Sequence, residues 1–282
     1  MSKVQQTKDL LKAVNDGDIE QVESILSNNS RLVNISNVFG WTLLNTAAEK
    51  GYIRIVQLLL DSGADPNKAD GSGWTPLYFA ARYGHPKIVQ LLLDAGANID
   101  KVDKYGRTPL FMAASFGHTA SVQLLLDAGA DINKANEDGA TPLYIAVEKG
   151  HMQISELLID VGADINKANK DGATPLYIAV EKGHERIVKL LLDSGANPNK
   201  ADDSGWTPLY LAVLYKHGQI VKLIEASEAK TKTKTKTKTK TKTKTATKTK
   251  NKTTKNKTTK NKTTKNKTTK NETTKNKTKK KN

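Results

Sequence analysis

A period of 33 residues runs through most of the chain and limits what it can fold into. The triplet Thr-Pro-Leu recurs at this interval, with Thr42-Leu43-Leu44 one step earlier, and its threonines are Thr75, Thr108, Thr141, Thr174 and Thr207. Sixteen of the 19 glycines stand two residues before, nine after or 21 after the threonine of this register. Such a period indicates a solenoid, in which each unit buries its apolar face only against its neighbours.

The unit from 73 to 103 shows the expected local structure. Thr75 can cap a helix through its hydroxyl, and Pro76 suits the first helical position because its missing N–H would have no partner there. Gly84 can end this helix in a left-handed conformation. Pro86 opens a second, mostly apolar helix that Gly96 ends, and a turn-rich loop follows. The sequence therefore predicts an all-α fold class.

The repeated pattern G-x-T-P-L-x-x-A-A…G-H-x-x-I-V-x-L-L-L-x-x-G-A-D resembles the ankyrin repeat over roughly residues 7–227. The resemblance implies a solenoid of helix-turn-helix units with β-turn fingers. The predicted repeats of this domain, 1–228, are 7–38, 39–71, 72–104, 105–137, 138–170, 171–203 and 204–227. The family usually has a histidine after Thr-Pro-Leu, and here that position holds Asn45, Tyr78, Phe111, Tyr144, Tyr177 and Tyr210. Whether its hydrogen bond is kept or is replaced by ring packing stays open.

The two ends of the array differ from its interior. Residues 9–14 and 19–26 are expected to form the first helix pair, with Gly17 at the turn and one extra residue before the next unit. In the last unit Glu225 stands where Leu192 stands one period earlier, and Lys216 stands where Gly183 does. An acid at a core position predicts that the final helix faces water, as a terminal repeat must, and that the array is complete.

A basic tail follows the repeats. Residues 229–282 comprise 23 Lys, 21 Thr, seven Asn, two Ala and one Glu, a net charge of +22, whereas the first 228 residues carry −6. The tail has no aromatic and no aliphatic side chain larger than Ala, so it cannot bury enough apolar surface to offset its ordering entropy. It is predicted to be disordered.

The tail suggests three interpretations. It could bind nucleic acid or an anionic membrane non-specifically and with strong salt dependence, through Lys230, Lys232, Lys234, Lys279, Lys280 and Lys281. Base-specific reading is not expected, because there are no aromatic rings on which bases could stack. Residues 277–281 could also serve nuclear import. The alternative is that the regular Lys-Thr and Asn-Lys-Thr-Thr-Lys runs arose by slippage in the coding DNA and have no selected function.

Several protein classes are excluded or disfavoured. With no cysteine, the chain has no disulfide framework, thiolate metal site or cysteine nucleophile. The N-terminus lacks the apolar run of a signal peptide or membrane span, so a cytoplasmic location is expected. Nuclear entry and export by a route without an N-terminal signal stay open. The Cys-free, Lys- and Asn-rich composition is similar to that of ankyrin proteins from intracellular bacteria.

No residues point to an enzyme. The five histidines are 33 residues apart, at 85, 118, 151, 184 and 217, so each occupies the same local setting. The resemblance implies that each bonds to the backbone at the turn between the helices. Glycine-rich phosphate loops and the common hydrolase motifs are absent. We therefore expect no catalytic residue, no cofactor and no metal.

The resemblance implies that partners dock on the finger tips and on the exposed face of the first helices. Repeats two to four present aromatic and arginine side chains there, which are enriched in binding hot spots, whereas repeats five and six present charges and alanine. The candidate residues are Trp41, Trp74, Arg82, Tyr83, Tyr105, Arg107 and Phe116. For all five rings of this set the alternative is packing on the neighbouring turn, which stiffens the stack. The expected function is a monomeric, non-enzymatic scaffold for a protein partner, and the alternative is a polyanion tether that acts through the tail.

Overall fold

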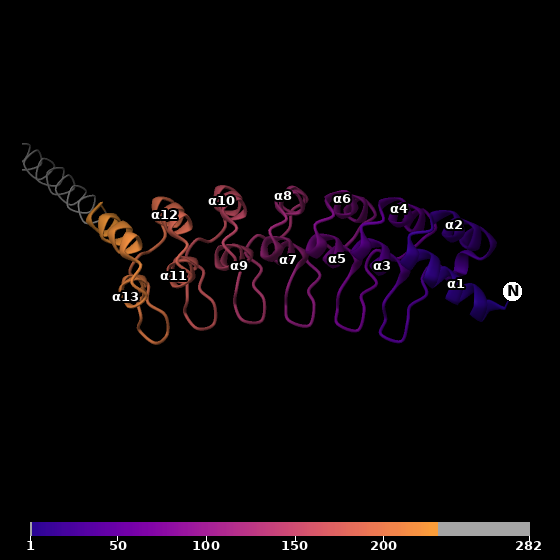
Figure 1. The fold of residues 1–282 in the computed structure, drawn as a ribbon, viewed down its shortest axis with the longest axis horizontal. Coiled ribbons are helices and arrows are strands. Elements are labelled where there is room, and N and C mark those ends of the chain that lie inside the picture. Colours follow the sequence, from indigo (N-terminus) through magenta and orange to yellow (C-terminus); the bar gives the residue numbers. More distant parts are fainter. Residues whose placement is uncertain (1, 231–282) are drawn as a thin grey trace, which may run out of the picture. The chain divides into compact units, whose positions relative to one another are not determined.

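The computed structural model describes residues 2–230, in which seven helix pairs lie side by side in a row (Figure 1). The contacts divide the chain into two units, Met1–Glu225 and Ala226–Asn282. The first unit holds the repeats. Of the second unit, the structure describes only residues 226–230, which are helical. None of the helices between residues 2 and 230 has the length and apolar character that a membrane crossing requires.

The first helices of the pairs are α1 (Lys3–Asp16), α3 (Leu43–Lys50), α5 (Pro76–Tyr83), α7 (Pro109–Phe116), α9 (Pro142–Glu148), α11 (Pro175–Glu181) and α13 (Pro208–Leu214). The second helices are α2 (Ile19–Asn28), α4 (Ile53–Asp61), α6 (Pro86–Asp94), α8 (Thr119–Asp127), α10 (Met152–Asp160), α12 (Glu185–Asp193) and a last helix that begins at residue 218. A short 3₁₀ helix, η1 (Ser30–Leu32), follows α2. The only strand-like pairing in the described residues is an isolated bridge between Ser36 and Thr42, so the all-α fold class is confirmed.

The helix boundaries follow from the repeated residues. The Thr75 hydroxyl accepts a hydrogen bond from the backbone N–H of Tyr78 at 3.2 Å, and Pro76 opens α5. Gly84 ends α5 with a φ of 71°, the left-handed conformation that glycine adopts without cost. In the last repeat the same place is held by Lys216, which adopts a φ of 60°. α6 begins at Pro86, as predicted, and ends two residues before Gly96.

The core runs through the row of repeats as one cluster. Consecutive first helices contact one another, and consecutive second helices do the same. The leucine after each Thr-Pro is fully buried in the interior repeats, as Leu77 and Leu143 show. Each helix pair therefore completes its core only against its neighbours, as a solenoid requires.

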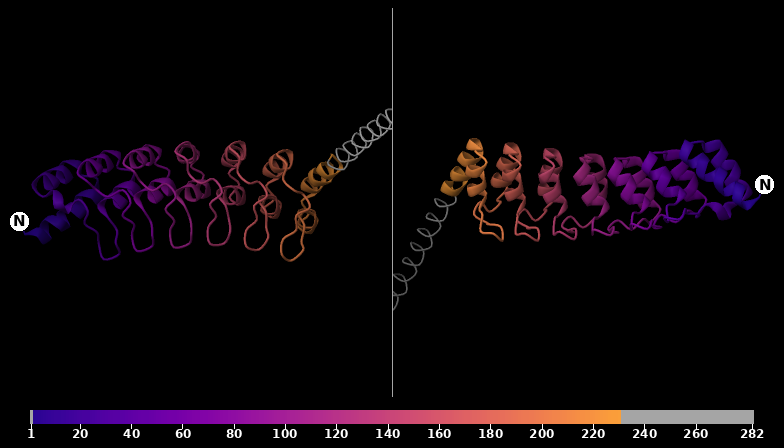
Figure 2. Two further views of the ribbon diagram at one scale, coloured as in Figure 1. Left: turned by 180° about the vertical axis from the view of Figure 1, so that it is seen from behind. Right: turned by 60° about the horizontal axis from the view of Figure 1, so that its bottom comes forward.

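Loops between the repeats form fingers that project from one edge of the row, while the second helices form the opposite edge (Figures 1 and 2). An Asn or Asp at the base of each finger accepts two backbone N–H groups of its own loop; at Asp70 these belong to Ser72 and Trp74. Neighbouring fingers are joined by backbone hydrogen bonds, such as Lys104 N–H to the carbonyl oxygen of Ser72 at 3.1 Å. The predicted β-turn fingers are present.

The structure corrects two predicted boundaries. The first helix pair is longer than predicted, because the Ser2 side chain caps α1 at Gln5 and the helix begins at Lys3. The predicted disordered tail began at residue 229, but residues 229 and 230 continue the last helix, whose sequence has no Gly or Pro after residue 218. The rest of the predicted tail, 231–282, lies outside the described residues.

Candidate partner-binding surface

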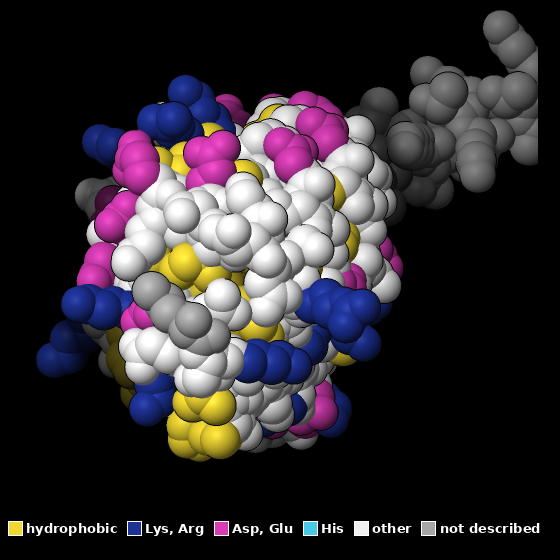
Figure 3. Space-filling view, turned by 90° about the vertical axis from the view of Figure 1, so that its right-hand side faces the viewer, with side chains coloured by type: hydrophobic (Ala, Val, Ile, Leu, Met, Phe, Trp, Pro, Cys, Tyr) yellow, Lys and Arg dark blue, Asp and Glu magenta, His cyan; other side chains and the backbone are white. Residues whose placement is uncertain are grey.

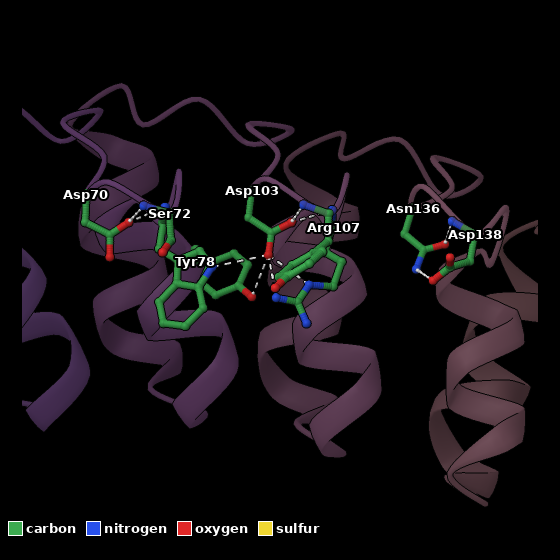
Figure 4. A network of polar contacts seen from close by, with 9 residues as sticks. Asp70, Ser72, Tyr78, Asp103, Arg107, Asn136 and Asp138 are labelled. Carbon is green, nitrogen blue, oxygen red and sulfur yellow. Dashed lines mark hydrogen bonds and ion pairs between the residues drawn. The ribbon is translucent and has the colours of Figure 1, made fainter. Parts of the chain in front are cut away.

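The buried carboxylate of Asp103 joins the third repeat to the fourth (Figure 4). Its Oδ1 accepts the backbone N–H groups of Tyr105 and Arg107, both at 2.9 Å. Its Oδ2 accepts the indole N–H of Trp74 at 3.2 Å and the hydroxyl of Tyr78 at 3.1 Å. The guanidinium of Arg107 donates to the same oxygen from Nε at 2.8 Å and from Nη2 at 2.6 Å. The carboxylate therefore fixes two residues of the candidate surface, Trp74 and Arg107.

The hydrogen bonds and charges of this network favour an ionised Asp103 and a protonated Tyr78. Burial by itself raises the pKa of the Asp103 carboxyl, but the hydrogen bonds from Arg107 and Tyr105 outweigh it, so that the pKa lies below its usual value. Burial and the negative charge of Asp103 raise the pKa of Tyr78, which keeps its hydroxyl protonated and able to donate. Asp103 is thus a buried anion that is paired and hydrogen-bonded, and no free negative charge is left beside the candidate cations.

A second cluster forms around Arg82, at the end of α5. The guanidinium lies 4.7 Å from the centre of the Phe116 ring of the next repeat, and 5.7 Å from the rings of both Trp74 and Tyr83. Tyr83 and Phe116 are exposed by 43 % and 46 %. Among residues 2–230 no carboxylate lies within ion-pair distance of Arg82. The guanidinium is therefore held by aromatic rings and keeps its hydrogen-bonding groups available.

Tyr105 carries two cations at the tip of the adjoining finger. The guanidinium of Arg107 lies 4.7 Å from the ring centre, and the ammonium group of Lys104 lies 5.0 Å from it. The ring is 47 % exposed. Together with the Arg82 cluster, this finger gives repeats three and four a surface of aromatic rings and positive charges.

The two tryptophans are partly buried and pack against the core. Trp74 stacks on Tyr78 with ring centres 5.3 Å apart and an interplanar angle of 9°. Trp41 lies 4.5 Å from Phe79 of the next repeat, and its indole N–H donates to Thr46 at 2.8 Å. These contacts favour the packing interpretation for both rings, although each residue keeps some solvent-accessible surface. The structure brings Trp74, Arg82, Tyr83 and Phe116 together, and leaves Trp41 linked to them only through Phe79.

The histidines occupy equivalent structural positions, as the resemblance implied. The Nε2 of His85 lies 3.0 Å from the carbonyl oxygen of Glu49 in the preceding repeat, and His118, His151 and His184 make the same contact. Because a carbonyl oxygen only accepts, Nε2 must carry the proton. Within residues 2–230 no group of three or more His, Cys, Asp or Glu side chains is placed to hold a metal ion.

At the position after Thr-Pro-Leu, where the family usually has a histidine, some repeats keep a hydrogen bond and others do not. The hydroxyl groups of Tyr78 and Tyr177 donate to Asp103 and Asp202 of the next finger, at 3.1 and 2.8 Å. Tyrosine therefore keeps a hydrogen bond to the next finger as well as ring packing. Phe111 can only pack, and Asn45 is fully buried with neither side-chain polar atom bonded to any described residue.

Some exposed apolar residues were not among the sequence candidates. Val38 and Phe39, at the first finger tip, are exposed by 94 % and 75 % and line an open groove against residues 69–72 of the next finger. The role of Asp103 was missed too. A signal was present: the finger position that holds Asp103 carries Asn or Asp in all six fingers, and Arg107 follows Asp103 by four residues. Of the polyanion candidates, Lys230 is exposed, and Lys232, Lys234, Lys279, Lys280 and Lys281 lie outside the described residues.

Comparison with known proteins agrees with this architecture. A family model described as ankyrin repeats in three copies matches residues 10–103, 95–169 and 161–235. A 65-residue stretch, 23 % of the chain, is 37 % identical to the 2-5A-dependent ribonuclease of Mus musculus. The match spans 9 % of that protein, so the similarity concerns a small part of the ribonuclease.

Proposed function

Because the chain belongs to the ankyrin repeat family, we propose that it is a non-enzymatic module that binds a protein partner across the fingers and first helices of repeats three and four. Ankyrin repeats generally mediate protein–protein interaction, and the finer assignment to this surface rests on Arg82. Its guanidinium is stacked on three rings and pairs with no carboxylate in the described residues. A partner carboxylate could accept its N–H groups without displacing an existing ion pair.

Repeats five and six lack this combination of an arginine and aromatic rings. At the positions of Arg82 and Tyr83 they hold Glu148 with Lys149 and Glu181 with Lys182, pairs whose charged atoms are 3.5 and 3.4 Å apart. Such exposed pairs contribute little to binding because they already satisfy one another and are well solvated. We assign them the role of spacers within the scaffold.

The test is capture of partners from a nuclease-treated lysate by the full chain, followed by measurement of the affinity for the captured partner. Arg82→Ala and Phe116→Ala should each weaken binding by about 30-fold, the loss expected for a hot-spot side chain. Lys149→Ala, at the repeat position of Phe116, is the matched control and should leave the affinity unchanged. Equal affinities for all variants, with unchanged circular dichroism and melting temperature, would refute the assignment to this surface.

The charge of residues 229–282 favours a second candidate, a polyanion tether. Binding to duplex DNA or to anionic vesicles should then fall steeply between about 50 and 200 mM salt, and should be lost when residues 231–282 are deleted. Binding that survives the deletion would remove this candidate. Because the deletion leaves repeats three and four intact, the two functions are tested independently.

A further inference from the structure

The last helix pair exposes side chains that interior repeats bury. Tyr210 and Val213 are exposed by 50 % and 60 %, whereas Tyr177 and Val180, one period earlier, are exposed by 8 % and 0 %. The difference arises because α13 packs on α11, which carries Tyr177 and Val180, while the described residues place no helix on α13 in the same way. Glu225 is exposed, as the sequence predicted, but the first helix of this repeat keeps the apolar face of an interior unit.

Four residues form what we call the end face: Trp206, Tyr210, Val213 and Leu214. Tyr210, Val213 and Leu214 follow the spacing i, i+3 and i+4, which places them on one side of α13. Trp206 lies two residues before the helix, with its ring beside that of Tyr210. Trp206 and Leu214 are exposed by 44 % and 47 %, and the Trp206 and Tyr210 ring centres are 5.4 Å apart. All four side chains are exposed and uncharged.

The end face is also uncharged. The segment 205–215 contains no Asp, Glu, Lys or Arg, whereas each of the five preceding segments in the same register contains at least one. Contact between two copies of this segment therefore buries no charged side chain of its own, which would be costly. The repeat that ends the row is the one whose first helix is best suited to pack on a copy of itself.

The opposite end of the row does not offer a matching surface. Figure 3 views the molecule from this side, where Lys, Arg, Asp and Glu side chains are spread over the surface and hydrophobic atoms gather in small groups. In α1 the exposed side chains include Lys3, Lys8 and Lys12, and Val4 is the only large hydrophobic one exposed there. Head-to-tail stacking of two chains would press these lysines against the end face, which disfavours that arrangement.

The basic tail of the chain is no better suited to cover the end face. Residues 231–282 consist of Lys, Thr and Asn with one Ala and one Glu. No side chain in this set can fill the space that an aromatic or branched aliphatic residue of a neighbouring repeat would occupy.

We propose that two copies of this chain associate through their end faces in a two-fold symmetric dimer. A two-fold contact sets the same patch against itself, which the uncharged end face allows. With about 200 Å² for a fully exposed aromatic side chain, the four residues expose on the order of 400 Å² per copy. The four residues of both copies together then contribute about 800 Å² of buried surface, at the small end for a specific interface. We therefore expect a weak dimer, with a dissociation constant of about micromolar. This dimer replaces the monomer that the sequence suggested.

The effect of salt distinguishes a dimer formed through the end faces from association through the tails. Each copy carries a strongly basic tail directly after its last repeat, so two copies repel one another at low ionic strength. Screening weakens this repulsion, while apolar contact between end faces does not depend on attraction between charges. The dimer is therefore expected to strengthen as salt is added, whereas association through the tails and a bridging polyanion would weaken.

The experiment is sedimentation velocity on the full, nuclease-treated chain from about 1 to about 100 μM, at low and moderate salt. We expect a concentration-dependent dimer that increases with salt, and Val213→Glu should raise its dissociation constant at least about tenfold. Val213 is exposed in the single chain, so this change should not prevent folding. The matched control is Val4→Glu, an equally exposed valine at the other end, which should leave the dimer intact.

Three outcomes would overturn the proposal. The first is a monomer at every concentration and at both salt levels, which would leave the end face to another occupant. The second is a dimer that Val213→Glu does not weaken while circular dichroism shows a folded chain. The third is association that disappears as salt increases. None of these outcomes bears on the protein-binding function proposed for repeats three and four, since the residues of the two surfaces are different.

Discussion

Trp74 and Asp103 are 29 residues apart in the sequence, yet the indole N–H of the first donates to the carboxylate of the second at 3.2 Å. The bond links two neighbouring fingers and holds the tryptophan against Tyr78. A ring that the sequence presents as a candidate contact is thereby also a part of the stack. Substitution of Asp103 should accordingly affect both the stability of the solenoid and the geometry of its proposed binding surface.

Asp103→Ala should lower the free energy of unfolding by about 3 kcal/mol. The change leaves a partly buried guanidinium, the side-chain donors of Trp74 and Tyr78 and two backbone N–H groups without their acceptor. Asp103→Asn should lower the free energy of unfolding by about half as much. Asn136 shows that an asparagine at this finger position still accepts the two backbone N–H groups of the loop. Urea unfolding followed by circular dichroism measures both changes. Equal stability of the alanine variant and the parent would contradict the central role of this carboxylate.

The stability of the chain should also depend on pH through Asp103. Its pKa is lower in the folded state than in the unfolded chain, so the unfolded state binds the proton more tightly. The stabilisation is therefore fully present above a pH of about 4 and is lost as the pH falls through the folded-state pKa. Unfolding free energies measured from neutral to acidic pH should fall more steeply for the parent than for Asp103→Asn. Parallel curves for the two proteins would argue against this assignment.

The repeat period allowed the architecture to be predicted, because glycine, proline and threonine act locally: Thr75 caps α5, and Gly84 ends it, through contacts within a few residues. The contacts between repeats were harder to predict. Whether an exposed ring such as Phe116 meets Arg82 depends on how far one repeat is rotated on the next, and a period in the sequence does not specify that rotation. The apolar end face is likewise visible only when the burial of Val213 is compared with that of Val180.

Lys216→Gly should stabilise the protein. Lys216 is the only described non-glycine residue with a positive φ, at 60°, and it stands where earlier repeats have glycine. A side chain in the left-handed region costs about 1 kcal/mol, which glycine avoids, although its greater freedom in the unfolded chain offsets part of the gain. We expect a net increase of roughly 0.5 kcal/mol in the unfolding free energy. Lys222→Gly, inside the last helix, is the contrasting control and should destabilise.

Asn45→Leu should be stabilising as well. Asn45 is fully buried in the core of the stack, and its Nδ2 and Oδ1 bond to no residue that the structure describes. The equivalent Tyr78 is long enough to reach Asp103 in the next finger, whereas the shorter asparagine makes no such bond to Asp70.

A buried amide without partners costs about 1–3 kcal/mol, and leucine has a similar volume without polar atoms. We therefore expect Asn45→Leu to raise the unfolding free energy by about 1 kcal/mol, and Asn45→Asp, which buries a charge in the same space, to lower it by more than that. Thermal and urea unfolding of the parent and of these two variants measures both changes in stability. A destabilised leucine variant would show that the amide is hydrogen-bonded in solution, and that the second repeat holds its polar side chain for a reason other than packing.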